Sequence, residues 1–187
     1  MDGRRFLMIL MVAAQVLAGC EGDRSASPAA GNEALRSRTD AQRGRLWVLG
    51  LDDVRVHDAE SKRLIRRIEL PAWSVAKFVC APDMVLDGSG SAIVSSNVQA
   101  RLWRIDGNTF EVREYEISLQ ERERWEIGFG ALAFAPDGSM MGLAASSGTL
   151  WRIDMNEGRA RLLRAGSPLL NLCEFTPQLL KELERSR

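Results

Sequence analysis

Short apolar runs alternate with polar turns along most of the chain, from residue 45 to residue 175. Most of the runs are five to eight residues long, and Gly, Asp, Asn and Pro stand between them. Runs of this length bounded by such residues are typical of short antiparallel strands, because these residues tolerate the backbone angles that tight turns need. The pattern therefore predicts an all-β domain over residues 45–177.

The apolar runs also repeat one another. Leu-Trp-Arg-Ile-Asp at 102–106 recurs unchanged at 150–154, 48 residues later, and a weaker copy, Val-Arg-Val-His-Asp, lies 48 residues earlier at 54–58. Ala-Pro-Asp occurs at 81–83 and again at 135–137. If these two segments are aligned, the loop at 84–91 is about six residues longer than the corresponding loop at Gly138. We therefore interpret the equal 48-residue spacing of the other segments as partly accidental.

The repeats predict twelve strands arranged as three four-stranded units. From the innermost strand outwards, the expected strands are 45–51, 54–58 and 63–70 for an incomplete first unit, 74–80, 92–97, 100–105 and 110–119 for the second, and 129–135, 141–146, 149–153 and 159–164 for the third. A last strand at 169–175 would complete the first unit. After it, Thr176 as N-cap and Pro177 at the first helical position predict a short helix over 178–187.

Two segments carry a resemblance to a known family. Gly-Ala-Leu-Ala-Phe-Ala-Pro-Asp-Gly at 130–138 resembles the innermost strand and first turn of a WD40-like β-propeller blade, and Asp-Asp-Val-Arg-Val-His-Asp at 52–58 resembles the third strand. The resemblance covers residues 45–177 and implies about three propeller blades, with no particular activity. Propeller rings usually have about 4–8 blades. Three blades would therefore form a ring with a second copy, be covered by a partner protein, or fold as a curled stack of sheets.

The longest apolar run lies at the start of the chain. Arg4 and Arg5 precede an apolar run over residues 6–18, which Gln15 interrupts, and the run ends in Leu-Ala-Gly-Cys at 17–20. Its 13 residues are fewer than the ~20 of a membrane-spanning helix, and the layout is typical of a signal peptide over residues 1–19. The four-residue ending resembles the lipobox of bacterial lipoproteins, which implies acylation of Cys20, for example with palmitate.

The lipobox resemblance implies a lipid anchor on the periplasmic side of a bacterial membrane. By similarity to enterobacterial lipoproteins, Glu21 in place of Asp favours the outer membrane over the inner one. Residues 20–44 are rich in Ser, Ala, Gly and charged side chains and poor in large apolar ones, so little surface is available to offset the entropy of ordering. We therefore expect an acylated cysteine followed by a flexible tether.

Charge and cysteine content narrow the function classes. The 25 basic and 25 acidic residues balance, which leaves no surplus of positive charge for a nucleic-acid partner. An oxidising periplasm would allow Cys80 and Cys173 to form a disulfide. Both lie in apolar, strand-like runs, so a pair of buried free thiols is the favoured interpretation. Because His57 is the single histidine and no CxxC occurs, we expect no metal site and no cofactor.

Three aspartates recur at equivalent positions, Asp58, Asp106 and Asp154. Each opens the turn between the third and fourth strands of a unit, and aspartate in such a turn accepts hydrogen bonds from turn amides. We therefore interpret them as structural. The segment 83–91, with Asp83 and Asp87, lacks the alternating oxygen ligands and distal glutamate of an EF-hand, so a calcium loop is not favoured.

Tryptophans supply the candidate binding residues. Trp103 and Trp151 occupy equivalent strand positions, and we expect them to pack between units. Trp73 and Trp125 precede innermost strands, in loops that would ring one mouth of a propeller channel, and are the candidate binding residues. No G-x-S-x-G motif, phosphate loop or serine–histidine pair is present, so we predict no catalytic residues and no enzyme.

These observations favour a lipid-anchored, non-catalytic platform for protein interaction, whose partner is another protein or a second copy. Strand addition at an exposed edge would be the physical mode. The alternative is a small-molecule or glycan-binding protein, or a propeller hydrolase, and it needs carboxylates such as Asp52, Asp53 and Asp137 to converge at the channel mouth. A shortened paralogue without a distinct role is the third possibility.

Overall fold

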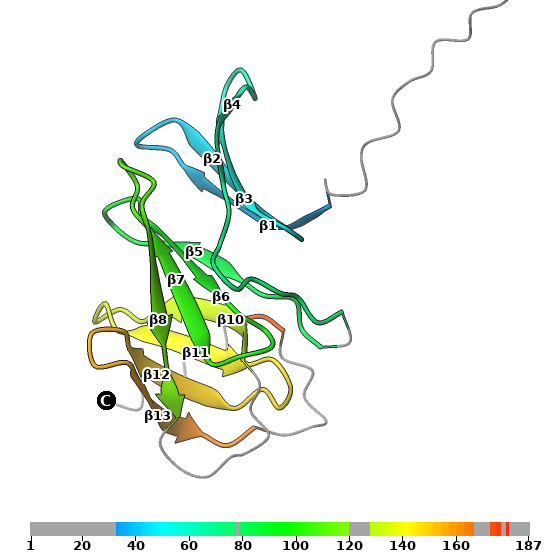
Figure 1. The fold of residues 1–187 in the computed structure, drawn as a ribbon. Helices are drawn as coiled ribbons and strands as arrows, with labels where there is room; N and C mark the ends of the chain where they lie inside the picture. Colours follow the sequence, from blue (N-terminus) through cyan, green and yellow to red (C-terminus); the bar gives the residue numbers. More distant parts are fainter. Residues whose placement is uncertain (1–32, 78, 120–127, 167–172, 177–178, 180–187) are drawn as a thin grey trace, which may run out of the picture.

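A computed structural model describes residues 33–77, 79–119, 128–166, 173–176 and 179 (Figure 1). The elements that it defines are strands: β1 Ala34–Asp40, β2 Arg45–Gly50, β3 Val54–Asp58, β4 Leu64–Ile68, β5 Met84–Leu86, β6 Ala92–Ser95, β7 Arg101–Ile105, β8 Val112–Glu116, β9 Ser118–Leu119, β10 Phe129–Phe134, β11 Met140–Ala144, β12 Leu150–Asp154 and β13 Arg159–Arg164. The all-β class is therefore confirmed. No helix in the described ranges is long and apolar enough to cross a membrane.

The strands form three sheets that follow one another along the chain, seen in Figure 1 from the blue end to the orange end. The first sheet has the order β1-β2-β3-β4, the second β5-β6-β7-β8, and the third β10-β11-β12-β13-β9. Neighbouring strands are antiparallel, except that β9 pairs with β13 in parallel. The described residues form an open series of sheets and no closed ring.

The innermost strand of the first sheet corrects the expected tether. Residues 34–40 were assigned to a flexible segment, but they form β1, which pairs with β2 from Asp40↔Arg45 to Ala34↔Gly50. Composition missed this strand because Leu35 is its single large apolar residue. Backbone pairing with β2 and ion pairs from Arg36 and Arg38 hold β1 in place instead.

Because β1 occupies the inner edge of β2, the first sheet is complete without a strand from the end of the chain. The expected closing strand at 169–175 is wrong for Cys173–Phe175, which have no strand structure, and residues 169–172 lie outside the described part. The expected helix over 178–187 also lies outside it, apart from the helical residue Leu179. The Leu179 N–H donates to Thr176 Oγ1 at 3.2 Å, as an N-cap threonine would accept it.

The second sheet corrects the alignment of the repeats. Its innermost strand is β5, Met84–Leu86, whereas the described residues of the expected strand at 74–80 are irregular. The Asp87 N–H donates to the Ser91 carbonyl, and the Ala135 N–H donates to the Ser139 carbonyl, so these turn positions are equivalent and lie 48 residues apart. The 48-residue repeat is therefore real in these sheets, and the two Ala-Pro-Asp segments are not equivalent.

Packing between consecutive sheets forms the core. Trp103 belongs to the cluster between the first and second sheets, and Trp151 belongs to the cluster between the second and third. Both are almost fully buried, at 1% and 0% exposure. The expectation that these repeated tryptophans pack between units is confirmed, and their large apolar area makes them major contributors to the hydrophobic stabilisation.

The outward faces of the first and third sheets, at the two ends of the series, are covered to different extents. On the third sheet, Met141, Leu143 and Leu150 are buried under Phe175 and Leu179 of the C-terminal segment. On the first sheet, Leu46 and Val48 alternate with the buried Trp47 and Leu49, are only partly buried, and belong to none of the clusters formed by described residues.

Candidate functional site

The sequence candidate Trp73 lies in the connection between β4 and β5, where a tight turn positions it. The Trp73 N–H donates to the Leu70 carbonyl at 3.3 Å, and Ala72 between them has φ 52°, in the left-handed region. A non-glycine residue in this region is strained and persists where the surrounding structure holds it. The indole Nε1 donates to the Leu51 carbonyl at 2.7 Å, which fixes the ring against the end of β2.

Trp73 also packs against the first core. Its ring meets Trp103 edge to face, with centroids 5.3 Å apart and an interplanar angle of 72°. Trp103 in turn donates from Nε1 to the Pro71 carbonyl at 3.1 Å, so the two indoles clamp the turn at 70–73. Trp73 is half-buried, so part of its ring packs in the core and part remains accessible to solvent.

A cavity of about 530 Å³ lies beside Trp73. Its polar lining comes from Asp52 at the end of the first sheet, from Arg67 and Glu69 at the end of β4, and from Lys77. These four residues are exposed, so their polar groups are accessible to solvent and to a ligand. The volume falls within the range of small-ligand sites, about 300–1,000 Å³.

A buried carboxylate positions one of the cations of this cavity. Asp53 is 1% exposed, and it forms ion pairs with Arg55, at 3.2 Å between Nε and Oδ1, and with Arg67 through Nε. A buried charge needs such partners, because desolvation would otherwise oppose ionisation. Since Arg67 keeps more than half of its side chain exposed, its remaining N–H groups are free to face solvent at the cavity.

Sequence reasoning named Trp73 and Asp52 but missed Arg67, Glu69 and Lys77. The available signal was the charged residues on both sides of an isolated Pro-Ala-Trp turn, at 67–77. The other expected binding residue, Trp125, lies outside the described residues, as does the expected acylation site Cys20.

The recurrent aspartates are turn residues, as expected from the sequence. Asp58 Oδ1 accepts from the backbone N–H and the hydroxyl of Ser61, each at 2.7 Å. Asp106 Oδ1 accepts from the N–H groups of Asn108 and Thr109, each at 2.8 Å, and Asp154 Oδ1 accepts from the N–H groups of Asn156 and Glu157. Their repetition therefore has a structural cause.

These hydrogen bonds also shift the pKa values of two of the turn aspartates. Bonds from the side chain and backbone of Ser61 lower the pKa of the Asp58 carboxyl, and backbone N–H groups of Thr109 and Asn108 lower the pKa of Asp106. Both shifts favour the charged form, because the bonds stabilise the carboxylate.

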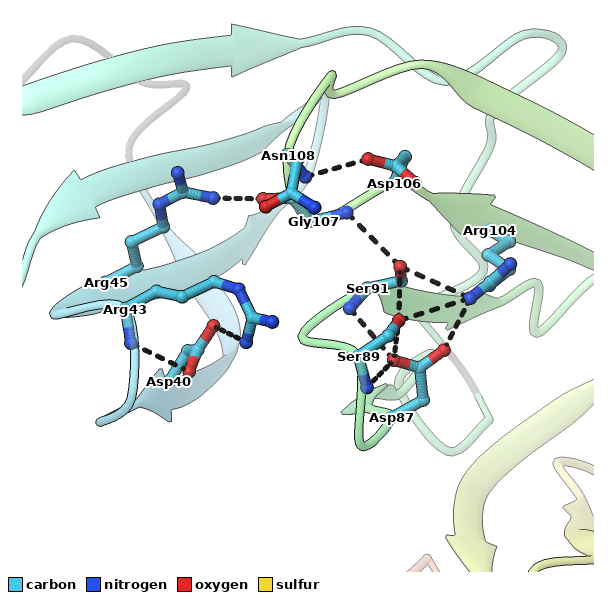
Figure 2. Close-up of polar contacts among 10 residues, drawn as sticks. All are labelled: Asp40, Arg43, Arg45, Asp87, Ser89, Ser91, Arg104, Asp106, Gly107 and Asn108. Carbon is cyan, nitrogen blue, oxygen red and sulfur yellow. Dashed lines mark hydrogen bonds and ion pairs between the residues drawn. The ribbon is translucent and has the colours of Figure 1, made fainter.

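The Asp87 carboxylate in the turn at 87–91 is satisfied by groups of this turn and by Arg104 of β7 (Figure 2). Asp87 accepts from the N–H and hydroxyl of Ser89, from the N–H of Ser91 and from Arg104. Burial acts to raise the pKa of Asp87, but these hydrogen bonds and the Arg104 charge outweigh it and lower the pKa. In the described ranges, no group of three or more His, Cys, Asp or Glu residues has the geometry to hold a metal ion.

Figure 2 also shows how the β7–β8 turn, which contains Gly107, connects the first sheet to the turn at 87–91. Arg45 of β2 donates from Nη1 to the Gly107 carbonyl, and the Gly107 N–H donates to Ser91 Oγ at 3.2 Å. A side chain at Gly107 would meet the Gly90 carbonyl oxygen at 2.5 Å. The close approach of the two turns therefore requires glycine there.

A second buried carboxylate, Asp83, connects all three sheets, a role that was not predicted from the sequence. Its Oδ1 is 2.9 Å from Arg38 Nη2 of β1, and its Oδ2 accepts from the Leu132 N–H of β10 at 2.9 Å. Asp83 itself directly precedes β5 and is 5% exposed. Its neighbours satisfy it fully, so Asp83 is a structural link and not a cation ligand.

Cys80 and Cys173 form a disulfide, with the sulfurs 2.00 Å apart. The favoured interpretation from the sequence, two free thiols, is therefore corrected in favour of its alternative. The cysteines lie 93 residues apart in the chain, and the bond attaches the C-terminal segment to the connection that carries Trp73. A distance of this kind between cysteines cannot be inferred from local sequence pattern.

The carboxylates that a hydrolase would need do not converge. Asp53 is engaged with Arg55 and Arg67 in the first sheet, whereas Asp137 lies in the β10–β11 turn and accepts from Ser139. Of these three carboxylates, Asp52 alone lines the cavity beside Trp73, where the second carboxylate is Glu69.

Comparison with known proteins yields a likeness of fold. No protein-family model matches the chain, and no curated protein matches it. A crystal structure of a Bacteroides thetaiotaomicron protein of unknown function has a TM-score of 0.52 and 14% identity, covering 72% of this chain and 38% of that one. The extracellular domain of the B. thetaiotaomicron protein BT4673 has a TM-score of 0.49 and 12% identity, over 68% of this chain and 16% of that one.

This chain spans less than half the length of these two solved proteins. At 14% identity the first likeness concerns the fold alone, and it supports the all-β class.

Proposed function

We propose that this protein is a lipid-anchored, non-catalytic interaction module on the periplasmic side of a bacterial membrane, built from three WD40-like blades. The signal-like leader and the Leu-Ala-Gly-Cys ending at 17–20 support the anchor, with Cys20 as the acylated residue. Glu21 favours the outer membrane. Three consecutive meanders of four antiparallel strands, the third of them extended by β9, support blade-like units.

The unequal ends of the sheet series carry the proposal. Leu46 and Val48 face away from the first core, beside Arg55 and His57 on the neighbouring strand. The equivalent end of the third sheet is covered by Phe175 and Leu179. We infer that a partner protein covers the first sheet and buries these two aliphatic side chains within a polar and basic rim.

Face-to-face packing is favoured over strand addition for this partner. The outer edge strand β4 is short, and its register shifts between Val56 and His57, so that Ile65 is an extra residue in a bulge. Exposed Lys62 and Arg63 precede β4 and exposed Arg66 lies in it, so all three add positive charge to the same edge. Short length, a bulge and positive charge are the features that prevent edge-to-edge pairing.

Photo-crosslinking in intact membranes tests the proposal. A photoreactive amino acid replaces Val48 in the full-length protein, and Glu157, on an exposed turn of the third sheet, is the control position. We expect one discrete adduct at position 48 and none at position 157. A Leu46→Arg change should abolish the adduct, since it places a second charge among the residues that the partner buries.

Light scattering of the purified mature chain identifies the partner class. A stable dimer, together with an adduct of twice the chain mass, means that the partner is a second copy. A monomer with a heavier adduct means another protein. Absence of an adduct at position 48, or equal adducts at both positions, contradicts the proposal.

Cys20 supports a separate test of the anchor. Metabolic labelling with a palmitate analogue should mark the protein, and Cys20→Ser should remove the label and release the protein from membranes. Retention of the label in Cys20→Ser would show that the anchor assignment is wrong.

A further inference from the structure

We propose that the cavity beside Trp73 is a binding site for an uncharged saccharide. The site shares no residue with the protein-binding face proposed on the first sheet. It combines a fixed aromatic ring, a rim of balanced charges and a volume of about 530 Å³. Each of these features restricts the chemistry of the ligand.

The ring of Trp73 is positioned before any ligand arrives. Its Nε1 already donates to the Leu51 carbonyl at 2.7 Å, and Trp103 supports it at a centroid distance of 5.3 Å. The indole therefore lines the cavity with its aromatic ring and has no free N–H donor. The faces of an aromatic ring carry partial negative charge and attract polarised C–H groups, which one side of a pyranose ring presents. The fixed geometry also reduces the entropy lost on binding.

The charges on the rim of the cavity balance, so the rim favours neither an anion nor a cation. Asp52 and Glu69 are acceptors, whereas Arg67 and Lys77 are donors, so two negative charges face two positive ones. An anion would meet the carboxylates, and a cation would meet the guanidinium and ammonium groups. A sugar hydroxyl both donates and accepts, so a row of hydroxyls satisfies both kinds of group.

Arg67 is the most firmly held group of the rim. Buried Asp53 fixes it through Nε, which leaves the other guanidinium N–H groups as oriented donors. The aromatic ring and the oriented cation come from different parts of the chain, the connection at 70–77 and the end of β4. An aromatic ring and hydrogen-bonding groups therefore line the same space.

The test uses the mature chain, residues 20–187 with Cys20→Ser, which retains every described strand and the disulfide. The probes are maltotriose and chitotriose, two neutral oligosaccharides, followed by saturation-transfer NMR and calorimetry. We expect one of them to bind, with saturation strongest on the C–H protons of one sugar face. Trp73→Ala should lower the affinity roughly tenfold or more, and Trp73→Phe should retain part of it because a ring remains.

Rim variants separate binding from folding. Asp52→Ala and Glu69→Ala should each weaken binding about tenfold, since each removes a hydrogen bond to a charged group. Glu33→Ala and Glu60→Ala are the matched controls, because they also remove exposed carboxylates but lie outside the cavity lining. All four variants should melt at the temperature of the parent chain.

Purified peptidoglycan distinguishes the sources of the saccharide. Binding to both chitotriose and sedimented peptidoglycan points to a wall glycan, whereas binding to maltotriose alone points to a free sugar, and either result supports the proposal. Failure of both oligosaccharides to bind overturns it. So does binding that Trp73→Ala and Asp52→Ala leave unchanged, or preferential binding of a peptide. None of these results alters the expected crosslink at Val48, so the two proposals fail independently.

Discussion

The first and third sheets have the same meander of inner, middle and outer strands, yet their outward faces differ. The third sheet buries Met141 and Leu143 beneath its own C-terminal segment, while the first sheet leaves Leu46 and Val48 partly exposed. The C-terminal segment is in turn secured by the disulfide between Cys80 and Cys173. The C-terminal segment thus covers the outward face of the third sheet, whereas the described residues leave that of the first sheet partly exposed, and this is the face on which we propose that a partner binds.

Removal of the disulfide should have the largest effect on the difference between the two sheets, because it releases the segment that covers the third sheet. The bond spans 93 residues, and the chain-entropy model gives about 4–5 kcal/mol of stabilisation for a loop of that size. The Cys80→Ser, Cys173→Ser double variant should therefore unfold at much lower denaturant concentration. Hydrogen exchange should increase first in β10–β13. Equal protection of the third sheet with and without the bond would contradict its role as a clamp.

The same substitution at the two ends sharpens the comparison. Leu143→Ala removes a fully buried side chain and should cost about 2–4 kcal/mol, whereas Leu46→Ala removes a partly exposed one and should cost less than about 1 kcal/mol. Urea unfolding of the monomeric chain measures both. Equal losses would show that the first face is already covered.

Substitution of Asp83 tests whether the three sheets stabilise one another. Asp83→Asn keeps the shape but weakens the bonds to Arg38 and to the Leu132 N–H, which link the second sheet to its two neighbours. The free energy of unfolding should fall by about 1–3 kcal/mol. The ion pair with Arg38 contributes only a small part of this loss, because the Arg38 side chain is more than a third exposed and solvent screens its charge. Unfolding should become less cooperative. A loss confined to the second sheet would contradict the linking role.

Acid should loosen the first two sheets through their turns. The folded-state pKa values of Asp58, Asp87 and Asp106 lie below the ordinary value of 3.8, so these groups contribute stability above that pH. The contribution should be lost as pH falls below 3.8, when the carboxylates become protonated in the folded protein. Asp87→Asn should flatten the acid limb of the stability curve, and an unchanged limb would contradict the assignment.

The smallest expected effect lies at the turn before Trp73. Ala72 has φ 52°, so Ala72→Gly should relieve strain while increasing the entropy of the unfolded chain. The net change in stability should stay within about 1 kcal/mol. A large loss of stability would show that the Ala72 methyl group itself packs in the turn.

The sequence by itself determined the all-β class, most of the strands from β2 to β13 and the structural role of Asp58, Asp106 and Asp154. These features are local, because alternation of apolar residues and turn chemistry act within a few positions. The sequence also supplied the only information on Cys20, which lies outside the described residues.

The tertiary structure decided the features that depend on distant partners. β1 became a strand because β2 supplies its hydrogen bonds, and the correct alignment of the repeats came from backbone pairing and not from the shared Ala-Pro-Asp. The disulfide, the linking role of Asp83 and the charged rim beside Trp73 bring together residues far apart in the chain. The local sequence pattern carries no information about the spatial distance between residues that are far apart in the chain. Only the folded structure therefore specifies these sites.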